Sequence, residues 1–193
     1  MRQKRTFARC SLVRRLAGVQ RRSGRASVAV VKAAYFTVAL ALAAPAAAAP
    51  SILFAGGGWA AIDRGASCEA ATRALGRIVK NRPHGLARFA FTPDRRRRGE
   101  FSARLSRQPR SGSSVMLRID HQRFLLVTRG TTAWSRGGLQ EQALIAAVRG
   151  TGAMRIEGRD AAGRPFVDRY ALAGAATAID AAAARCAGKI ARK

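Results

Sequence analysis

The sequence contains few histidines and no recognisable catalytic motif, and these shortages exclude several classes of function. Only two histidines occur among 193 residues, and no H-E-x-x-H, no paired histidine–carboxylate spacing and no P-loop is present. Metal and nucleotide sites therefore have no support in the sequence. No G-x-S-x-G surrounds any serine, and Asp120-His121, with Ser113 or Ser114 nearby, is better explained as a turn than as part of a catalytic triad. We therefore predict a protein that is not an enzyme and has no cofactor.

Acidic side chains are also scarce. The chain has 36 Lys and Arg against 10 Asp and Glu, a formal net charge of +26, while 48% of its residues are hydrophobic. That hydrophobic share argues against general disorder. The basic excess is typical of proteins that contact nucleic acid or an anionic membrane surface, or that carry a basic tail. It is unevenly distributed, since residues 1–32 hold ten basic and no acidic side chains, and residues 73–110 hold twelve basic and two acidic ones.

Residues 1–48 have the pattern of a leader with a secretory signal peptide. A basic stretch ending at Lys32 precedes an Ala-rich apolar run, and the run ends in the small residues Ala46 and Ala48. We predict cleavage after Ala48 and export, either to the periplasm or to the cell surface and medium. Residues 49–193 then form a single β-rich domain without a stable transmembrane span. The alternative is a single-pass membrane anchor, for which the run is short and too rich in alanine.

The basic stretch of the leader is longer than a signal peptide requires. A start at Val30 or Val31 would leave Lys32 directly before the apolar run. The chain has 31 Arg and five Lys, which fits a GC-rich genome, where start sites are easily misassigned. We therefore predict that residues 1–29 are a start-site artefact.

Cysteine usage points in the same direction as the leader. Of three cysteines, Cys10 lies in the leader, and Cys68 and Cys186 remain in the predicted domain. An even number of cysteines in an exported chain predicts a disulfide between them, because the compartment is oxidising. Two buried free thiols or a metal site are the alternatives. Cys186 shares one face of a predicted helix with three apolar residues, Ile179, Ala182 and Ala183.

Alternation of apolar and polar residues predicts a series of short strands. Two such segments at 88–91 and 101–105, joined by turn residues at 93–99, predict a hairpin with an arginine tip. Residues 69–87 fit either a short helix or a second strand that runs into a loop, and Gly56–Gly58 is interpreted as a flexible start of the domain. Further strands are predicted at 59–62, 115–119, 124–127, 133–134, 154–157 and 166–172.

Two segments have helical periodicity. Apolar residues at helical spacing begin at Leu139 and end before Gly150, which predicts a helix over 139–149. A C-terminal helix is predicted over about 175–187, with Thr177 and Asp180 forming a capping box at its start. Together the elements predict a mainly β, β-sandwich-like single domain of roughly seven or eight strands, with one internal helix and one C-terminal helix.

The order of several short motifs resembles a known family. Cys68-Glu69-Ala70 is followed by Ala133-Trp134-Ser135-Arg136, by a helix–glycine–strand unit at 139–158, and by a segment at 168–174 that leads into an Ala-rich helix. Over roughly residues 57–188 the chain is similar in this order to the invasion-associated locus B family of small exported bacterial proteins. The resemblance implies an exported β-sandwich-like domain without known catalytic residues, linked in some members to the invasion of host cells. Family members typically have further cysteines in their middle part, whereas this chain has none between Cys68 and Cys186.

The run Arg95-Arg96-Arg97-Arg98 is the candidate binding site. Four guanidinium groups at a hairpin tip can hold phosphates of lipopolysaccharide, of phospholipid headgroups or of nucleic acid. The alternative is a solvated loop in an arginine-rich protein. Nucleic acid is not the partner that we expect, because nucleic-acid modules interleave exposed aromatic residues with basic ones. Here the neighbouring Phe89, Phe91 and Phe101 fall at strand spacing and are core candidates.

The two tryptophans, Trp59 and Trp134, can form either a carbohydrate platform or part of the core, and their alternating surroundings favour the core. We therefore predict an exported protein that acts by binding an envelope or host-cell component. The alternative is a binder of anionic polymers or lipids, such as lipopolysaccharide, nucleic acid or polysaccharide, through the basic loop.

Overall fold

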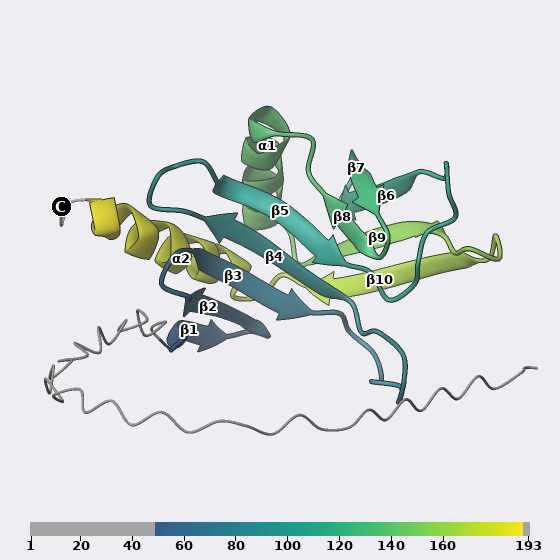
Figure 1. Cartoon of the computed structure of the whole chain (residues 1–193), viewed down its shortest axis with the longest axis horizontal. Helices are drawn as coiled ribbons and strands as arrows, with labels where there is room; N and C mark the ends of the chain where they lie inside the picture. Colours follow the sequence, from purple (N-terminus) through teal and green to yellow (C-terminus); the bar gives the residue numbers. More distant parts are fainter. Residues whose placement is uncertain (1–48, 191–193) are drawn as a thin grey trace, which may run out of the picture. The chain divides into compact units, whose positions relative to one another are not determined.

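Ten strands and two helices make up residues 49–190, the part of the chain that the computed structural model describes (Figure 1). The predicted mainly β class, with one internal and one C-terminal helix, is confirmed. The predicted leader at 1–48, its cleavage site and the start-site artefact at 1–29 lie outside the described residues. In chain order the elements are β1 (Ser51–Gly56), β2 (Trp59–Asp63), β3 (Cys68–Arg73), β4 (Leu86–Phe91), β5 (Arg98–Arg104), β6 (Val115–Ile119), β7 (Gln122–Arg129), β8 (Thr132–Trp134), α1 (Gly138–Arg149), β9 (Ala153–Arg159), β10 (Pro165–Ala171) and α2 (Ala175–Ile190).

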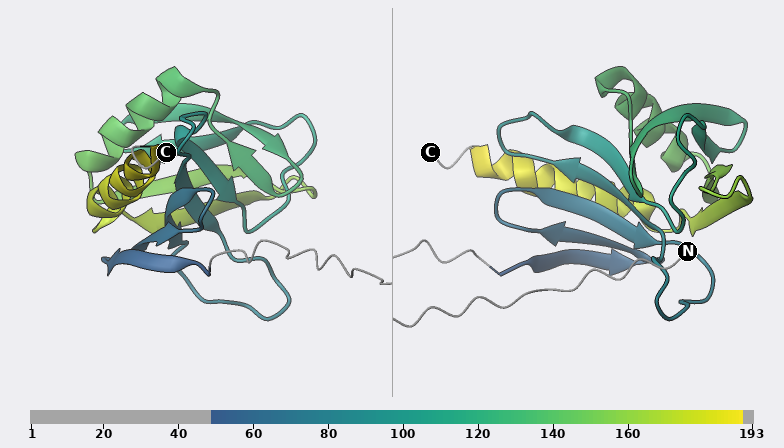
Figure 2. Two further views of the ribbon diagram at one scale, coloured as in Figure 1. Left: turned by 60° about the vertical axis from the view of Figure 1, so that its left-hand side comes forward. Right: turned by 45° about the vertical axis from the view of Figure 1, so that its right-hand side comes forward.

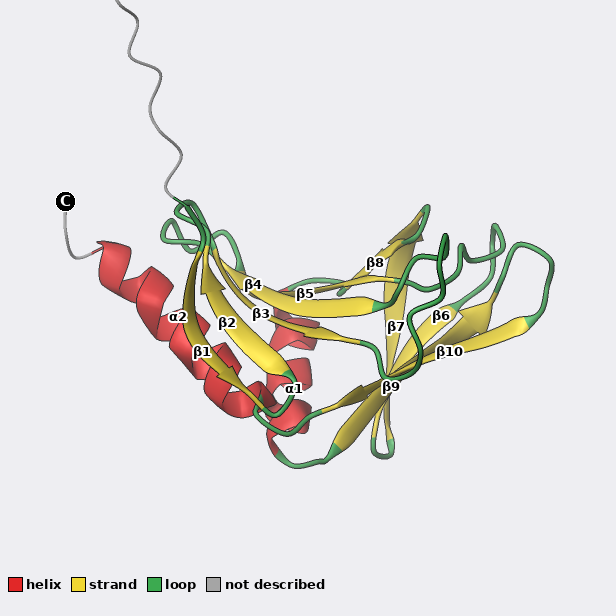
Figure 3. Ribbon diagram, turned by 90° about the horizontal axis from the view of Figure 1, so that it is seen from below, coloured by secondary structure: helices red, strands yellow, loops and turns green. Residues whose placement is uncertain are grey.

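The strands form one antiparallel sheet in the order β1-β2-β3-β4-β5-β8-β7-β6-β9-β10. The first five strands follow one another as hairpins, and β8 then joins β5 to β7. Figure 3 shows β1–β5 side by side and β6, β9 and β10 turned away from them, so the sheet is sharply bent. The bend lets one continuous sheet enclose a core in the way that two packed sheets do.

Two hydrogen bonds fix the bend by joining β10 to the beginning of the sheet. The indole Nε1 of Trp59 donates to the carbonyl of Ala171 at 2.8 Å. The backbone N–H of Leu75, just after β3, donates to the carbonyl of Arg169 at 2.6 Å. Trp59 is 1% exposed and stacks on Phe89 at 6.2 Å between ring centroids, so it belongs to the core rather than to a carbohydrate platform. Trp134 is half-buried.

Both helices cover the same side of the first strands (Figure 2). Helix α2 packs on β1, β2 and β3, and α1 packs on β5 and against α2. Because β-strand side chains alternate, the residues facing the helices recur at every second position, as in the buried Phe89, Phe101 and Ala103. The remaining half of the core is closed by the inward residues of β6, β9 and β10, which are Val115, Leu117, Ile119, Met154, Ile156, Phe166 and Tyr170.

The glycines at 56–58 have a different role from the predicted flexible start. Gly57 and Gly58 form the turn between β1 and β2, with φ of 59° and 85°. A Cβ on Gly57 would lie 2.1 Å from the carbonyl oxygen of Ala173, and one on Gly174 would lie 2.2 Å from that of Gly56. These glycines therefore allow two backbones to meet between the first hairpin and the start of α2.

Two further expectations are resolved by the structure. The ambiguous segment 69–87 is strand as far as Arg73 and then a long loop to Gly85. The predicted capping box is wrong, because α2 begins at Ala175 and Thr177 lies inside its first turn. Asp180 instead forms an ion pair with Arg149 of α1. Among the described residues, neither helix is long and apolar enough to cross a membrane.

Candidate anion-binding site

The predicted arginine run lies at the tip of the predicted hairpin, with Arg95–Arg97 in the turn between β4 and β5 and Arg98 as the first residue of β5. Thr92 closes the turn, because its N–H donates to the carbonyl of Arg97 at 3.0 Å and its hydroxyl accepts the N–H of Arg97 at 3.1 Å. Asp94 accepts the N–H of Arg96 at 3.1 Å. The Thr92 hydroxyl also donates to the Asp94 carboxylate, and this bond, followed by the one from the Arg96 N–H, lowers the pKa of Asp94. The backbone of the tip is therefore held by hydrogen bonds within the turn.

Three of the four arginines line a hollow between the hairpin tip and α2. The hollow has a volume of about 290 Å³. Arg95, Arg97 and Arg98 form its basic side, while Arg96 lies outside it with 88% of its side chain exposed. The remaining lining residues are Phe91 and Thr92 from the hairpin and Ala183, Cys186 and Ala187 from α2.

The charges around the hollow are only partly neutralised within the protein. Arg96 pairs with Asp94 at 3.3 Å, and Arg97 pairs with Glu100 at 3.5 Å. Arg95 and Arg98 form no ion pair within residues 49–190. Two exposed guanidinium groups on the hollow are therefore free to bind an anion.

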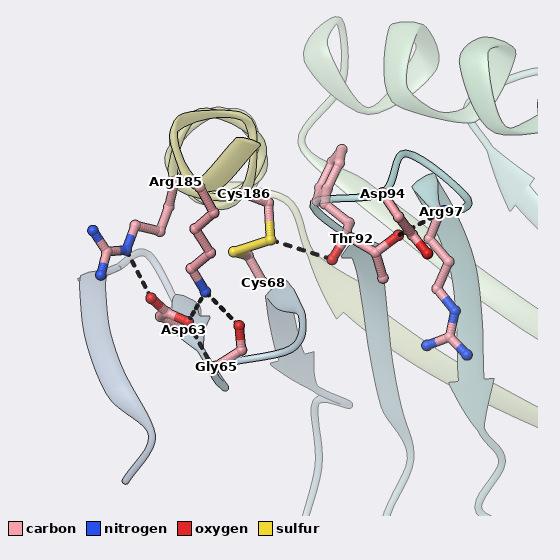
Figure 4. The surroundings of a disulfide bond; sticks show 10 residues. Asp63, Gly65, Cys68, Thr92, Asp94, Arg97, Arg185 and Cys186 are labelled. Atoms are coloured by element: carbon pink, nitrogen blue, oxygen red, sulfur yellow. Dashed lines mark hydrogen bonds and ion pairs between the residues drawn. A yellow bond between two sulfur atoms is a disulfide. The ribbon is translucent and has the colours of Figure 1, made fainter. Parts of the chain in front are cut away.

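The α2 wall of the hollow is fixed by a disulfide. Cys68 of β3 and Cys186 of α2 are bonded, with 5.8 Å between their Cα atoms, as the sequence predicted (Figure 4). The sulfur of Cys186 also lies 3.4 Å from the carbonyl oxygen of Phe91. The helix face that carries Cys186 is thus held directly beside the end of β4, where the arginine turn begins.

An ion cluster on the next turns of α2 adds a second attachment (Figure 4). The carboxylate of Asp63, at the end of β2, accepts a hydrogen bond from Arg185 at 2.7 Å and another from Lys189. Lys189 also donates to the carbonyl of Gly65 at 2.7 Å. The hydrogen bond from Lys189 is the largest effect that lowers the pKa of Asp63 to about 2, opposed by burial and aided by Arg185. The carboxylate is therefore charged at neutral pH and keeps α2 against the sheet.

The lining of the hollow is suited to a ligand with an anionic group and an apolar part. Guanidinium groups offer a planar fork of N–H donors that matches a phosphate or carboxylate, and Arg95 and Arg98 have no competing acidic partner in the described part of the chain. The floor formed by Phe91, Ala183 and Ala187 is apolar. The sequence identified the arginines and placed Ala183 on the same helix face as Cys186, but it did not show that Ala183 and Ala187 line the hollow beside the arginines.

The two histidines, His84 and His121, lie apart from the hollow. Nε2 of His84 lies 2.7 Å from the carbonyl oxygen of Ala74, and His121 is exposed beside Asp120 at 3.4 Å. The hydroxyl of Ser113 donates to the carbonyl of Arg110 at 2.7 Å. Within residues 49–190, no group of three His, Cys, Asp or Glu side chains is placed to hold a metal ion.

Comparison of the chain with protein-family models, with curated proteins and with solved structures finds no significant match. The resemblance to the invasion-associated locus B family therefore stays a prediction from the order of its motifs.

Proposed function

We propose that the protein is a non-enzymatic exported protein, of invasion-associated locus B type, that binds an anionic envelope lipid such as lipopolysaccharide in the hairpin hollow. The observation that carries this proposal is the meeting of Arg95, Arg97 and Arg98 with the apolar wall of α2 in one hollow. Phosphate groups attached to an apolar body are the defining chemistry of such lipids. The predicted leader and the disulfide support a place in the periplasm or at the cell surface.

A lipid headgroup suits the hollow better than a nucleic acid or another long polymer. The three phenylalanines next to the tip are buried, with Phe89 and Phe101 fully inside the core and Phe91 only 9% exposed. Phe89 and Phe101 therefore cannot stack on bases, and Phe91 offers only the part of its ring that forms the floor of the hollow, whereas single-stranded nucleic-acid binders present exposed aromatic rings. The hollow is also bounded on one side by α2, which favours a compact group over an extended chain. A host-cell component with the same phosphate chemistry would use the same residues.

The experiment compares two double variants of equal net charge. Arg95→Ser with Arg98→Ser removes the two arginines of the hollow that lack an ion pair within the described residues. Arg96→Ser with Arg136→Ser removes two exposed arginines that do not line the hollow. Binding of each purified protein to lipopolysaccharide is measured by titration at one ionic strength.

We expect the hollow variant to bind at least about tenfold more weakly, because each lost hydrogen bond to a charged group contributes about 1.5–3 kcal/mol. The control variant should bind like the unchanged protein. Equal weakening of both variants would mean that only the overall charge matters, and it would contradict the proposal. Thermal unfolding of all three proteins should coincide, since the substituted side chains are exposed.

A further inference from the structure

A row of four arginines crosses the second half of the sheet, on the face that points away from the core. Arg123 of β7 is the cross-strand partner of Arg118 of β6, Arg118 is the partner of Arg155 of β9, and Arg155 is the partner of Arg169 of β10. Neighbouring strands are about 4.8 Å apart, so the row is about 14 Å long. These four residues come from four different strands and are brought together only by the register of the sheet.

The row carries more positive charge than its surroundings neutralise. Glu157 accepts a hydrogen bond from Arg118 at 3.0 Å and pairs with Arg155 at 3.3 Å. Arg123 and Arg169 are exposed and form no ion pair with any residue between 49 and 190. Like charges directly opposite each other on a sheet destabilise it. An anion that binds across the row would remove this repulsion.

A hollow lies over three of these arginines. Its volume is about 440 Å³, and Arg118, Arg155 and Arg169 all line it. Asp120 also lines it, but its carboxylate is 56% exposed and lies beside His121. The other lining residues are Leu75, Thr151, Gly152, Ala153, Met154 and Tyr170. A hollow of this size accommodates a small phosphorylated group.

An exposed apolar loop borders the same hollow. The loop at 74–85, between β3 and β4, exposes Leu75 (61%), Ile78 (69%) and Val79 (51%). It also carries Arg77, Lys80 and Arg82, and no acidic residue occurs between positions 70 and 93. Exposed apolar side chains flanked by Lys and Arg are typical of segments that enter the interface of an anionic membrane.

Backbone and side-chain contacts hold this loop beside the arginine row. The N–H of Leu75 donates to the carbonyl of Arg169 at 2.6 Å, and Leu75 itself lines the arginine hollow. Arg77 and Val79 border a neighbouring depression together with Val167, which is on the outer face of β10. The apolar tip and the phosphate-sized hollow are therefore parts of one surface.

We propose that this surface docks on a phospholipid bilayer. The hollow over Arg118, Arg155 and Arg169 receives the phosphate of an anionic lipid headgroup, and Ile78 and Val79 enter the interfacial region beside it. A soluble phosphate ester would fit the arginines but would leave the exposed apolar residues unexplained. Strand β4 runs from this loop to the Arg95–Arg98 turn, so the bilayer surface and the hairpin hollow lie at opposite ends of that strand and act independently.

The test uses co-sedimentation of the purified protein with phosphatidylcholine vesicles that contain or lack phosphatidic acid. Two variants probe the surface, Arg155→Gln with Arg169→Gln and Ile78→Ser with Val79→Ser. The charge-matched control is Arg96→Ser with Arg136→Ser, two exposed arginines that line neither hollow. The hairpin variant, Arg95→Ser with Arg98→Ser, is measured beside it. Thermal unfolding of each protein shows that the exposed substitutions leave it folded.

We expect the unchanged protein to bind vesicles with phosphatidic acid much more tightly than vesicles of phosphatidylcholine alone. Loss of two arginines should weaken that binding by about thirtyfold. Loss of Ile78 and Val79 should weaken it by at least about tenfold. The control should retain binding, which shows that the position of the lost arginines rather than the total charge determines the loss.

Two results would overturn the proposal. In the first, both surface variants bind the vesicles as well as the unchanged protein does. In the second, the Ile78 and Val79 variant binds normally while soluble glycerol phosphate displaces the protein from vesicles. That pattern would identify a site for free phosphate esters rather than for a bilayer.

Discussion

Breaking the disulfide between Cys68 and Cys186 should lower the free energy of unfolding by about 5 kcal/mol. The two cysteines are 118 residues apart, so the bond restricts a long loop in the unfolded chain, and the chain-entropy relation gives this value for such a loop. Both residues are at most 1% exposed, so the substitution Cys68→Ala with Cys186→Ala leaves only small gaps in the core. A typical domain has a total stability of about 5–15 kcal/mol, so the loss would be a large fraction of it.

The measurement is urea unfolding of the oxidised protein, of the reduced protein and of the double alanine variant, followed by circular dichroism. With a slope of about 2 kcal/mol per molar urea, the midpoint should fall by about 2.5 M in both the reduced protein and the variant. Intact mass confirms which form is present. A loss below about 1 kcal/mol in both would refute the reasoning, because it would show that the unfolded chain gains little freedom when the bond is absent.

Three further predictions concern the sheet and its edges. The pKa of Asp63 is about 2 in the folded protein and 3.8 in the unfolded chain, so its ion pairs contribute roughly 2 kcal/mol of stability above pH 4. Urea unfolding should show that this contribution is lost as the pH falls toward 2. The variant Asp63→Asn should not show this loss. Gly57→Ala should lower thermal stability by more than about 2 kcal/mol through its clash with the backbone after β10, whereas Gly65→Ala, with open space around it, should lose only about 1 kcal/mol. Arg169→Gln should raise the melting temperature at low salt and leave it unchanged at high salt, because Arg169 lies opposite Arg155 and forms no ion pair among the described residues.

The elements predicted well from the sequence are those with a strong period. Phe89 and Phe101 alternate with polar residues on either side of turn residues, and the structure pairs them directly across the β4–β5 hairpin. The disulfide was predicted from the even number of cysteines in an exported chain, and the helical spacing added that Cys186 faces the core. In contrast, β1 was missed, since a register shift between Ile52 and Phe54 breaks the alternation in that edge strand.

The arginine row on the outer face of the sheet could not be predicted from the sequence, for a different physical reason. The alternation of Leu117 and Ile119 predicts that Arg118 points outward, but it does not say which strand lies next to β6. The neighbour is β9, reached through β7, β8 and α1, so the pairing of Arg118 with Arg155 depends on long-range topology. A local pattern fixes the face on which a side chain lies, whereas its neighbours on that face depend on the whole sheet.

Seven of the twelve basic residues between positions 73 and 110 lie in two separate groups, and the separation has a measurable consequence. The loop at 74–85 and the turn at 95–98 lie at opposite ends of β4, a strand of six residues and therefore about 20 Å long. This distance exceeds the Debye length of about 8 Å at physiological ionic strength, so a charge removed at one end hardly changes the potential at the other. A protein carrying both the hairpin variant and the Arg155 and Arg169 variant should therefore show each binding defect unchanged in size. Coupling between the two defects would mean that one ligand spans both ends.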